Sequence, residues 1–539
     1  MKNFSYKTRL ENIEILKSEM FDLLIIGGGI TGAGVARDAA LRGLKVALVE
    51  QQDFAIGTSS RSSKLIHGGI RYLENFDFKL VFEALSERNK LFLMAPHLSH
   101  PLRFLIPLYK NSRVGMFKMG LGMWLYDALA LFQAPKLHER LNANETVSRY
   151  PIVEAADLKG SYVYSDGYMD DDRLVHETLR SAHEADAICI NYVSVLDRKK
   201  VNKNIQIVSV KNQKTNELFE IKAKYIISTV GPWTDLVGSV MVEKWKKILR
   251  PTKGIHLTFS KDKINLPTAV VMAAEKSSRI IFAIPRHEMI IIGTTDTDFQ
   301  GHPEDVNVNK EDVEYLLKTA NQYFPGANLK PADIISSYAG VRPLIQDESG
   351  TEGKTSREHA ILHDDGISFI AGGKYTTYRK MSEDIVDQVL KFFIFEKQVS
   401  LKKCETNTAF NEYTTVENYK VAVNETKENQ INQLLALRYG SEYKVIRNNF
   451  TKYQNYWQLE ACQAIHTTMC MSLTDFYCRR VPLFLSQKDQ GLSLLNEIAD
   501  VFKAELNLTT IEIEQQKNDL LNYIKKEFAW RKSFNLESL

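Results

Sequence analysis

The sequence predicts an α/β protein with a Rossmann-type nucleotide-binding unit near its N-terminus, a β-rich middle and a helical C-terminal region. An apolar run ending in glycine, a stretch of small residues with helical character and a second apolar run follow one another within residues 22–50. Further β-rich segments recur through the middle of the chain. From about residue 400 the segments are rich in Lys, Glu, Asn and Leu and contain one proline, Pro482.

Length and composition favour a globular enzyme of two or three domains. The chain has 539 residues, of which 44% are hydrophobic and 25% charged, and its net charge of +3 gives no support to nucleic-acid binding. The five cysteines are never closer than eight residues, so the spacing predicts neither a CxxC metal site nor a disulfide framework. We expect reduced thiols in a cytoplasm and no metal.

The N-terminal segment and the longest apolar stretch both argue against export and membrane insertion. Glu11, Glu14 and Glu19 stand in the first twenty residues, which contain no apolar run of signal-peptide length. The stretch 114–132 is the nearest to a membrane span, but Lys118 and Asp127 interrupt it. We therefore expect a cytoplasmic chain that does not cross a membrane.

The first βαβ unit carries a dinucleotide-binding motif. A strand over 22–27, a helix over 31–41 and a strand over 45–50 frame the sequence GGGITG, which satisfies G-x-G-x-x-G. Gly27 permits the tight turn, Gly29 lets the backbone approach a pyrophosphate, and Gly32 lets the helix pack on the strand. Glu50, at the end of the second strand, is expected to accept hydrogen bonds from ribose hydroxyls.

Later segments add strands, one helix and two groups of aspartates. Strands are predicted over residues 225–230, 279–284, 289–293 and 367–371, and a helix over 378–393. The motif GGKYTT precedes that helix, so Thr376 and Thr377 lie at its start. Consecutive aspartates do not make a closed ligand sphere, so we interpret the acidic groups as structural and not as a metal site: Asp170, Asp171, Asp172, Asp296 and Asp298.

An unusual concentration of donors directly follows the nucleotide-binding unit. The stretch GTSSRSSKLIHGGIRYL, residues 57–73, contains four serines, two arginines, a lysine and a histidine. Hydroxyl groups and backbone amides of this kind can bind the acceptor atoms of a flat polar ligand, and Gly68 and Gly69 let the chain pass close to it. The stretch therefore predicts a cofactor-binding loop.

Together these motifs resemble the FAD-dependent glycerol-3-phosphate dehydrogenase family. The resemblance rests on seven segments in order: DLLIIGGGITGAGVARDAALRG, GTSSRSSKLIHGGIRYL, YSDGYMDDDRLV, STVGPW, IIGTTDTDF, YAGVRPL and GGKYTTYRKMSEDIVD. It implies a glutathione-reductase-like FAD-binding domain made of residues 1–75, 150–245 and 345–398. A β-rich substrate-binding or cap domain would comprise residues 76–149 and 246–344, and a helical domain residues 399–539.

The resemblance also implies which residues bind the cofactor and the substrate. A helix start and a lysine would stabilise the negative charge that develops on the flavin ring, which assigns Thr376, Thr377 and Lys374 to that role. Arginine and lysine suit a phosphate group because they form charge-assisted hydrogen bonds with it. The implied FAD residues are Gly27, Gly29, Gly32, Glu50, Ser59, Ser60, Ser63, Lys64, Leu65, His67, Gly231, Thr376 and Thr377, and the implied substrate residues are Arg71, Tyr72, Arg342, Arg357 and Lys374.

The function implied is oxidation of sn-glycerol 3-phosphate to dihydroxyacetone phosphate, with hydride transfer from C2 to flavin N5 and electrons passing to a quinone. Lys374, Arg342, His67 and His256 are candidates for catalysis. The two histidines are alternative general bases, and a third alternative is that an arginine or lysine lowers the pKa of the substrate hydroxyl. Three alternatives stay open: an oxidase that uses oxygen, another flavin-dependent amine or amino-acid oxidase, and a non-enzymatic nucleotide-binding protein. A homodimer is possible.

A quinone acceptor would require contact with a membrane, so we expect peripheral association with the inner face of the cell membrane. The candidate segment is 103–132, where apolar and aromatic residues alternate with cations as in an interfacial segment. The same residue types at these spacings are also typical of a protein core. The residues concerned are Phe104, Leu105, Tyr109, Met116, Phe117, Met123 and Trp124, with Lys110, Arg113 and Lys118.

Overall fold

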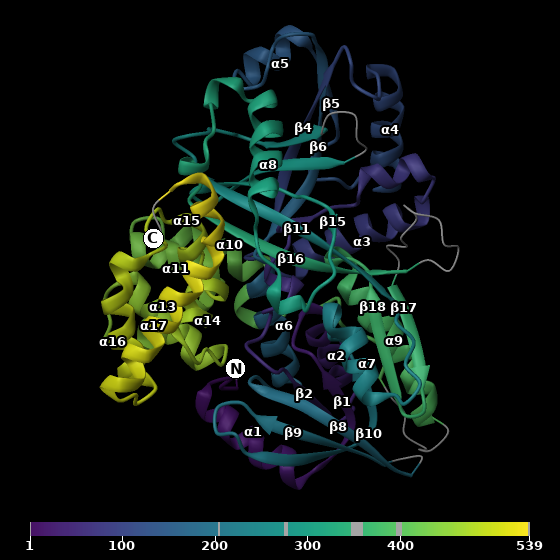
Figure 1. The fold of residues 1–539 in the computed structure, drawn as a ribbon, viewed down its shortest axis with the longest axis vertical. Helices are drawn as coiled ribbons and strands as arrows, with labels where there is room; N and C mark the ends of the chain where they lie inside the picture. Colours follow the sequence, from purple (N-terminus) through teal and green to yellow (C-terminus); the bar gives the residue numbers. More distant parts are fainter. Residues whose placement is uncertain (1, 203–204, 274–278, 347–358, 395–401, 537–539) are drawn as a thin grey trace.

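The computed structural model describes residues 2–202, 205–273, 279–346, 359–394 and 402–536, which form two sheets and a helical region (Figure 1). The first sheet has the strand order β17 (His359–Asp364), β18 (Ile367–Gly372), β10 (Leu218–Ser228), β1 (Met20–Ile26), β2 (Val46–Val49) and β7 (Ile188–Ile190). The neighbours from β18 to β7 are parallel. A further strand, β9 (Ile205–Asn212), pairs with β10 and with β8 (Val193–Asn202).

Helices cover both faces of this first sheet, which explains its continuous apolar strands. Leu23 and Ile25 of β1 pack in one core cluster with α2 (Ile30–Leu41), α6 (Asp171–Glu184) and α9 (Tyr378–Ile394). Leu24 and Ile26 point to the other face, toward α1 (Tyr6–Ser18) and α7 (Thr234–Met241). A parallel sheet that is buried on both sides needs apolar residues at every position and not only at alternate ones.

The second sheet supplies the opposite wall of the molecule. Its order is β15 (Thr297–Asp298), β11 (Leu249–Ser260), β14 (Met289–Gly293), β13 (Ile280–Arg286), β12 (Ala269–Ala273), β4 (Ser99–Tyr109), β6 (Leu158–Met169) and β3 (Leu65–Ile66), with β16 (Ser336–Ile345) on β11 and β5 (Glu139–Asn142) on β6. The helices that contact its strands include α3 (Phe78–Met94), α4 (Met116–Leu129), α5 (Ala143–Arg149), α8 (Lys310–Tyr323) and α15 (Leu483–Ser486).

The region 402–536 is helical, and in Figure 1 its helices lie side by side at the left of the molecule. Its apolar residues join the core cluster of the second sheet, so it is packed onto the rest of the chain. The helices are α10 (Val416–Glu425), α11 (Gln430–Tyr439), α12 (Tyr443–Asn449), α13 (Tyr456–Thr467), α14 (Leu473–Arg479), α15 (Leu483–Ser486), α16 (Leu495–Glu505) and α17 (Thr510–Glu527).

The predicted strands and the predicted helix over 378–393 are confirmed, but one expected domain boundary is wrong. The segment 150–245 begins with β6, which pairs with β4 along its whole length and therefore belongs to the second sheet. Strand β3, inside the expected first segment, pairs with β6 as well. The chain thus enters the second sheet before residue 75 and returns to the first near residue 170, because backbone pairing and not sequence position decides sheet membership.

Candidate active site

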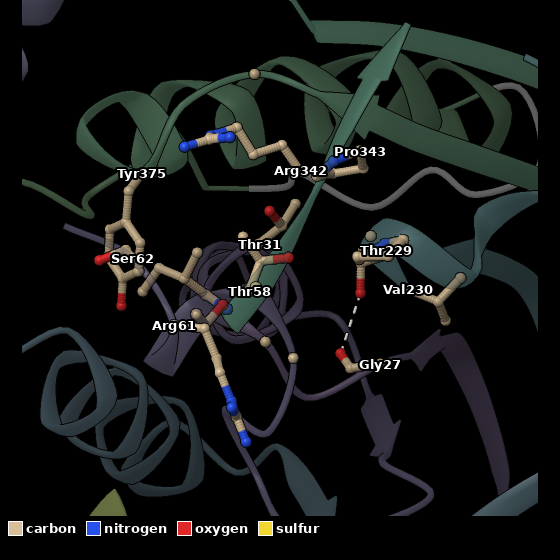
Figure 2. A pocket seen from close by; sticks show the side chains of 18 of the residues that line it. Gly27, Thr31, Thr58, Arg61, Ser62, Thr229, Val230, Arg342, Pro343 and Tyr375 are labelled. Atoms are coloured by element: carbon tan, nitrogen blue, oxygen red, sulfur yellow. Dashed lines mark hydrogen bonds between the residues drawn. The ribbon is translucent and has the colours of Figure 1, made fainter. Parts of the chain in front are cut away.

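A cavity of about 360 Å³ lies where loops of the first sheet meet strands of the second (Figure 2). The loops that follow β1, β2, β10 and β18 line one side of it, and residues of β11 and β16 line the other. Ligands of open α/β sheets bind beyond the carboxyl ends of the strands, where the loops separate. The cavity has that position.

The glycine motif shapes one end of the cavity. Gly27 has a φ of +105°, and a side chain at Gly32 would place its Cβ 1.9 Å from the Gly27 carbonyl oxygen. Gly29 is the N-cap of α2 and has no side chain that could cap the helix. The first backbone amides of α2 therefore lie at the cavity and need other hydrogen-bond acceptors. Ser59 Oγ accepts a hydrogen bond from one of these amides, that of Ile30, at 3.0 Å. The remaining donors suit a pyrophosphate.

Glu50 stabilises the glycine loop in addition to lining the cavity. Its carboxylate accepts hydrogen bonds from the Gly28 amide at 2.8 Å and the Gln52 amide at 2.9 Å. Burial raises the pKa of Glu50, and these two amides oppose that shift by stabilising the charged form. A carboxylate here is well placed for ribose hydroxyls.

The serine-rich loop is only partly a cavity wall. Ser59, Ser63, Leu65 and His67 line the cavity, while Ser60 does not. Lys64 departs from the expectation of a cofactor residue because its side chain is fully buried and forms an ion pair with Asp171, which also accepts a hydrogen bond from Ser62 Oγ at 2.7 Å. The aspartates at 170–172 are buried in the protein interior, where Asp171 binds Lys64 and Ser62.

His256 of β11 is a neutral buried base at the cavity wall. Its ring stacks on Tyr338 with centroids 4.8 Å apart, and its Nε2 lies 2.8 Å from Ser63 Oγ. Its Nδ1 has no hydrogen-bond partner among the described residues. Burial, with help from Arg342 and Lys64, holds the pKa of His256 well below its usual range.

Two of the predicted substrate cations lie at the cavity. Arg342 of β16 donates to Thr294 Oγ1 at 2.8 Å and to the Thr295 carbonyl at 3.1 Å, and its Nη1 lies 3.3 Å from Asp296. Lys374 Nζ lies 3.6 Å from the ring centroid of Tyr72, and both residues line the cavity.

One other predicted cation, Arg71, is not brought to the cavity. Arg71 is exposed and is not among the lining residues. Arg357 lies outside the described residues, so its predicted role stays a prediction.

The segment that connects β18 to α9 closes the cavity. Gly372 and Gly373 have φ values of +73° and +77°, and a short 3₁₀ turn over Tyr375–Thr377 leads into the helix. Gly231, Lys374 and Thr376 line the cavity, whereas Gly32 and Thr377 lie behind the lining residues. Their predicted roles are therefore indirect: Gly32 permits close packing, and Thr377 Oγ1 donates to the Lys374 carbonyl at 3.3 Å.

Several lining residues are not predicted from the sequence. Thr229 Oγ1 donates to the carbonyls of Ile26 and Gly27, at 2.9 and 3.0 Å, and so anchors the glycine loop (Figure 2). Its position directly after β10, beside β1, is the signal that could have identified it. Thr58, Arg61 and Ser62 lie inside the predicted cofactor-binding loop, although none of them was assigned a role of its own. The other lining residues without an individual prediction include Trp233, Gly254, Gly340 and Pro343.

The donor set fits FAD. A helix N-terminus and the half-buried Glu50 carboxylate at one end of the cavity suit a pyrophosphate and a ribose. Hydroxyls, glycine backbone and the unpartnered His256 Nδ1 at the other end suit a ring with several acceptor and donor atoms. FAD would therefore be held by the loops after β1, β2 and β18.

Comparison with known proteins agrees with this geometry. Residues 22–379 match the FAD dependent oxidoreductase family. The aerobic glycerol-3-phosphate dehydrogenase of Staphylococcus saprophyticus is 37% identical over 94% of this chain and 94% of its own length. The chain belongs to this family of FAD-dependent oxidoreductases. A Staphylococcus aureus member is 35% identical over 93% of this chain and 95% of its own.

Solved structures share the fold of most of this chain. The glycerol-3-phosphate dehydrogenase of Bacillus halodurans, solved with FAD, has a TM-score of 0.80 at 28% identity and covers 97% of this chain and 98% of its own. The L-alpha-glycerophosphate oxidase of Mycoplasma pneumoniae has a TM-score of 0.54 at 19% identity and covers 72% of this chain and 98% of its own. The second likeness concerns the fold alone. FAD is the cofactor of the family.

Proposed function

We propose that the protein oxidises sn-glycerol 3-phosphate to dihydroxyacetone phosphate and passes the electrons to a quinone. The observation that carries the proposal is the cationic part of the cavity, where Arg342 is oriented by Thr294, Thr295 and Asp296. A planar guanidinium fixed at the cavity wall suits a phosphate, because it can bind the phosphate oxygens through charge-assisted hydrogen bonds. Lys374 adds a second cation in the same cavity.

FAD, when bound, supplies the two-electron acceptor for hydride from C2 of the substrate. The protein must accept the hydroxyl proton, and of the two candidate histidines His256 has the better support. Its lowered pKa keeps the ring neutral and able to accept a proton. A bound dianionic phosphate nearby would raise that pKa and make the ring a stronger base. Ser63, 2.8 Å from its Nε2, fixes the ring orientation.

Anaerobic reduction of the purified flavoprotein tests the assignment. Glycerol 3-phosphate is expected to bleach the oxidised flavin absorption, whereas glycerol and glycine leave it unchanged. A soluble quinone then restores the absorption in the absence of oxygen. Bleaching by glycine and not by glycerol 3-phosphate would contradict the substrate. Rapid recovery with oxygen together with none with quinone would contradict the acceptor and support an oxidase.

We also propose that the protein docks on an anionic membrane surface through the exposed side of α4. This apolar face consists of Phe117, Leu121, Trp124, Leu125, Leu131 and Phe132, all of which are exposed. Phe117 and Trp124 are 80% and 60% exposed, and Lys110 and Lys118 lie beside the face in sequence and are also exposed. Among the described residues, no helix has the length and apolarity to cross a bilayer.

The structure narrows the segment that we expected to dock. Phe104, Leu105 and Met123 are buried in the core cluster of the second sheet, so they do not reach a membrane. Arg113 forms an ion pair with Glu74, at 2.6 Å. The docking proposal therefore rests on α4 and on the residues that follow it, because the most exposed apolar side chains of the expected segment lie there.

Flotation with vesicles that contain anionic lipid tests this surface. The double variant Phe117→Ser/Trp124→Ser is expected to reduce vesicle binding by about tenfold or more, since each aromatic side chain loses its buried apolar area. Dye-linked activity in solution should be retained. Leu236→Ser/Val240→Ser is the matched control, because these exposed residues lie on α7, away from α4. Equal flotation of both double variants would move the docking site elsewhere.

A further inference from the structure

The C-terminal helices contact the cofactor loop through two separate groups of buried charges. The loop is the segment 50–64, which runs from Glu50 past Ser59 and Ser63 along the cavity. One group holds Asp53, near the dinucleotide end of the loop. The other holds Arg61, beside Ser62 and Ser63. Neither group has a role in the proposed chemistry.

The first group is fully buried. Asp53 accepts hydrogen bonds from Arg479 Nε at 2.6 Å and from Arg480 Nη1 and Nη2 at 2.8 and 2.9 Å. Burial alone would raise the pKa of Asp53, but Arg480 and Arg479 hold it well below its usual range, so the carboxyl group is charged. Each arginine makes a further hydrogen bond. Arg479 Nη2 donates to Asp475 Oδ1 at 2.7 Å, and Arg480 Nε donates to Thr468 Oγ1 at 2.7 Å.

The two residues that follow Asp53 contact the glycine loop. The Ala55 amide, two residues further on, donates to the Gly28 carbonyl at 3.1 Å, and Ala55 itself has a φ of +65°. A side chain on Gly28 would contact the Phe54 ring at 2.6 Å, so Phe54 packs tightly on the same glycine. The position of Asp53 therefore helps to set the position of the backbone that faces the pyrophosphate.

The second group fixes the loop near the flavin end. Arg61 Nη1 lies 2.7 Å from Glu527 Oε1, and its Nη2 donates to the Tyr523 hydroxyl at 2.8 Å. Both partners belong to α17. Burial opposes the charge on Arg61, but Glu527 raises its pKa above the usual value. In Figure 2 the Arg61 side chain points away from Arg342 and Thr229.

We propose that the C-terminal helical region clamps the cofactor loop, and that Arg480 through Asp53, and Glu527 through Arg61, are positioning residues for FAD. The two ion-pair groups lie at either end of the loop, so together they define its path along the cavity. By thermodynamic linkage, FAD binding stabilises the C-terminal helices to the same extent that these helices strengthen FAD binding. The proposal requires FAD in the cavity and is independent of the substrate.

The principal test is Glu527→Gln, which removes the charge opposite Arg61 and keeps the shape of the side chain. The FAD dissociation constant of the reconstituted full-length protein, followed by flavin fluorescence, is expected to rise about 5- to 150-fold, the usual range for coupling between two sites. Glu505→Gln is the matched control. Glu505 binds Tyr453 and His466 within the C-terminal helices and touches no part of the loop.

A second readout separates clamping from simple loss of stability. Added FAD should raise the melting temperature of the wild-type apoprotein and of Glu505→Gln by the same amount, and that of Glu527→Gln by less. Asp53→Asn is expected to weaken FAD binding in the same way, and if it does not fold, Glu527→Gln still decides. An unchanged FAD dissociation constant for Glu527→Gln, or an equal weakening in Glu505→Gln, would overturn the proposal. Anaerobic bleaching by glycerol 3-phosphate is a separate measurement, so failure of the substrate assignment is distinguishable.

Discussion

Gly32→Ala is expected to abolish FAD binding and to destabilise the protein. The added Cβ would lie 1.9 Å from the Gly27 carbonyl oxygen and 2.7 Å from Thr229 Oγ1, so α2 must move away from the glycine loop. Overpacking in a close-packed interior costs about 1–3 kcal/mol, and a contact with rigid backbone places this change at or above the upper end. Displacement of the helix also removes charge-assisted hydrogen bonds to the pyrophosphate, which weakens FAD binding by roughly 100-fold or more.

The measurements are flavin content after purification and the free energy of unfolding. Gly122→Ala is the control, because nothing lies within 4 Å of a Cβ at this helical position on α4. It should retain full flavin and gain slightly in stability, since alanine favours a helix by about 0.5–1 kcal/mol over glycine. Retention of flavin by Gly32→Ala would mean that the close approach of α2 to the glycine loop does not determine cofactor binding.

Arg342→Ala is expected to reduce kcat/KM for glycerol 3-phosphate by roughly 10- to 150-fold while the protein keeps its flavin. This range corresponds to the loss of one charge-assisted hydrogen bond to a phosphate, about 1.5–3 kcal/mol. Flavin content should change little because the residues that would hold the pyrophosphate and the ribose, the glycine loop and Glu50, are separate from Arg342. Steady-state kinetics with a soluble acceptor and the flavin absorption spectrum measure the two effects separately.

Two further variants make the Arg342 experiment specific. Arg250→Ala removes an arginine on β11 that pairs with Asp298 at 3.0 Å and does not line the cavity, so its kinetics should match the wild type. Arg342→Lys keeps the charge but loses the planar fork, and we expect a value between wild type and alanine. Wild-type kinetics for Arg342→Ala with full flavin would show that the phosphate binds elsewhere.

The local hydrophobic pattern of the sequence predicts the first strands of the first sheet, the helix between them and the glycine turn that joins strand to helix. The run DLLII, the small residues after the glycines and the second apolar strand predict β1, α2 and β2 because helix and strand periodicity is a property of neighbouring residues. The glycines could be assigned roles from spacing alone, since Gly27 requires a positive φ and Gly32 a close approach. The family resemblance added Arg342 and Lys374 to the candidate site, and the need for a general base added His256.

The long-range partners could not be predicted in this way. Lys64 stands in a loop rich in cofactor donors, but Asp171, 107 residues further along the chain, removes it from the cavity. Arg71 directly precedes Tyr72, which lines the cavity, yet it lies on the exposed side of the turn. Whether a charged side chain faces a ligand, an ion-pair partner or solvent depends on which distant segment packs against it.

The sequence by itself determined the first strand–helix–strand unit, the dinucleotide turn, several later strands and the family, because these depend on neighbouring residues and on short motifs. Only the tertiary structure decided the rest. It assigned β6 to the second sheet, buried Phe104 while exposing Phe117, and brought Arg479 and Arg480 onto Asp53, more than 400 residues away along the chain. Whether a side chain is buried or forms an ion pair depends on the residues around it. Those residues come from segments that are far apart in the sequence and share no pattern.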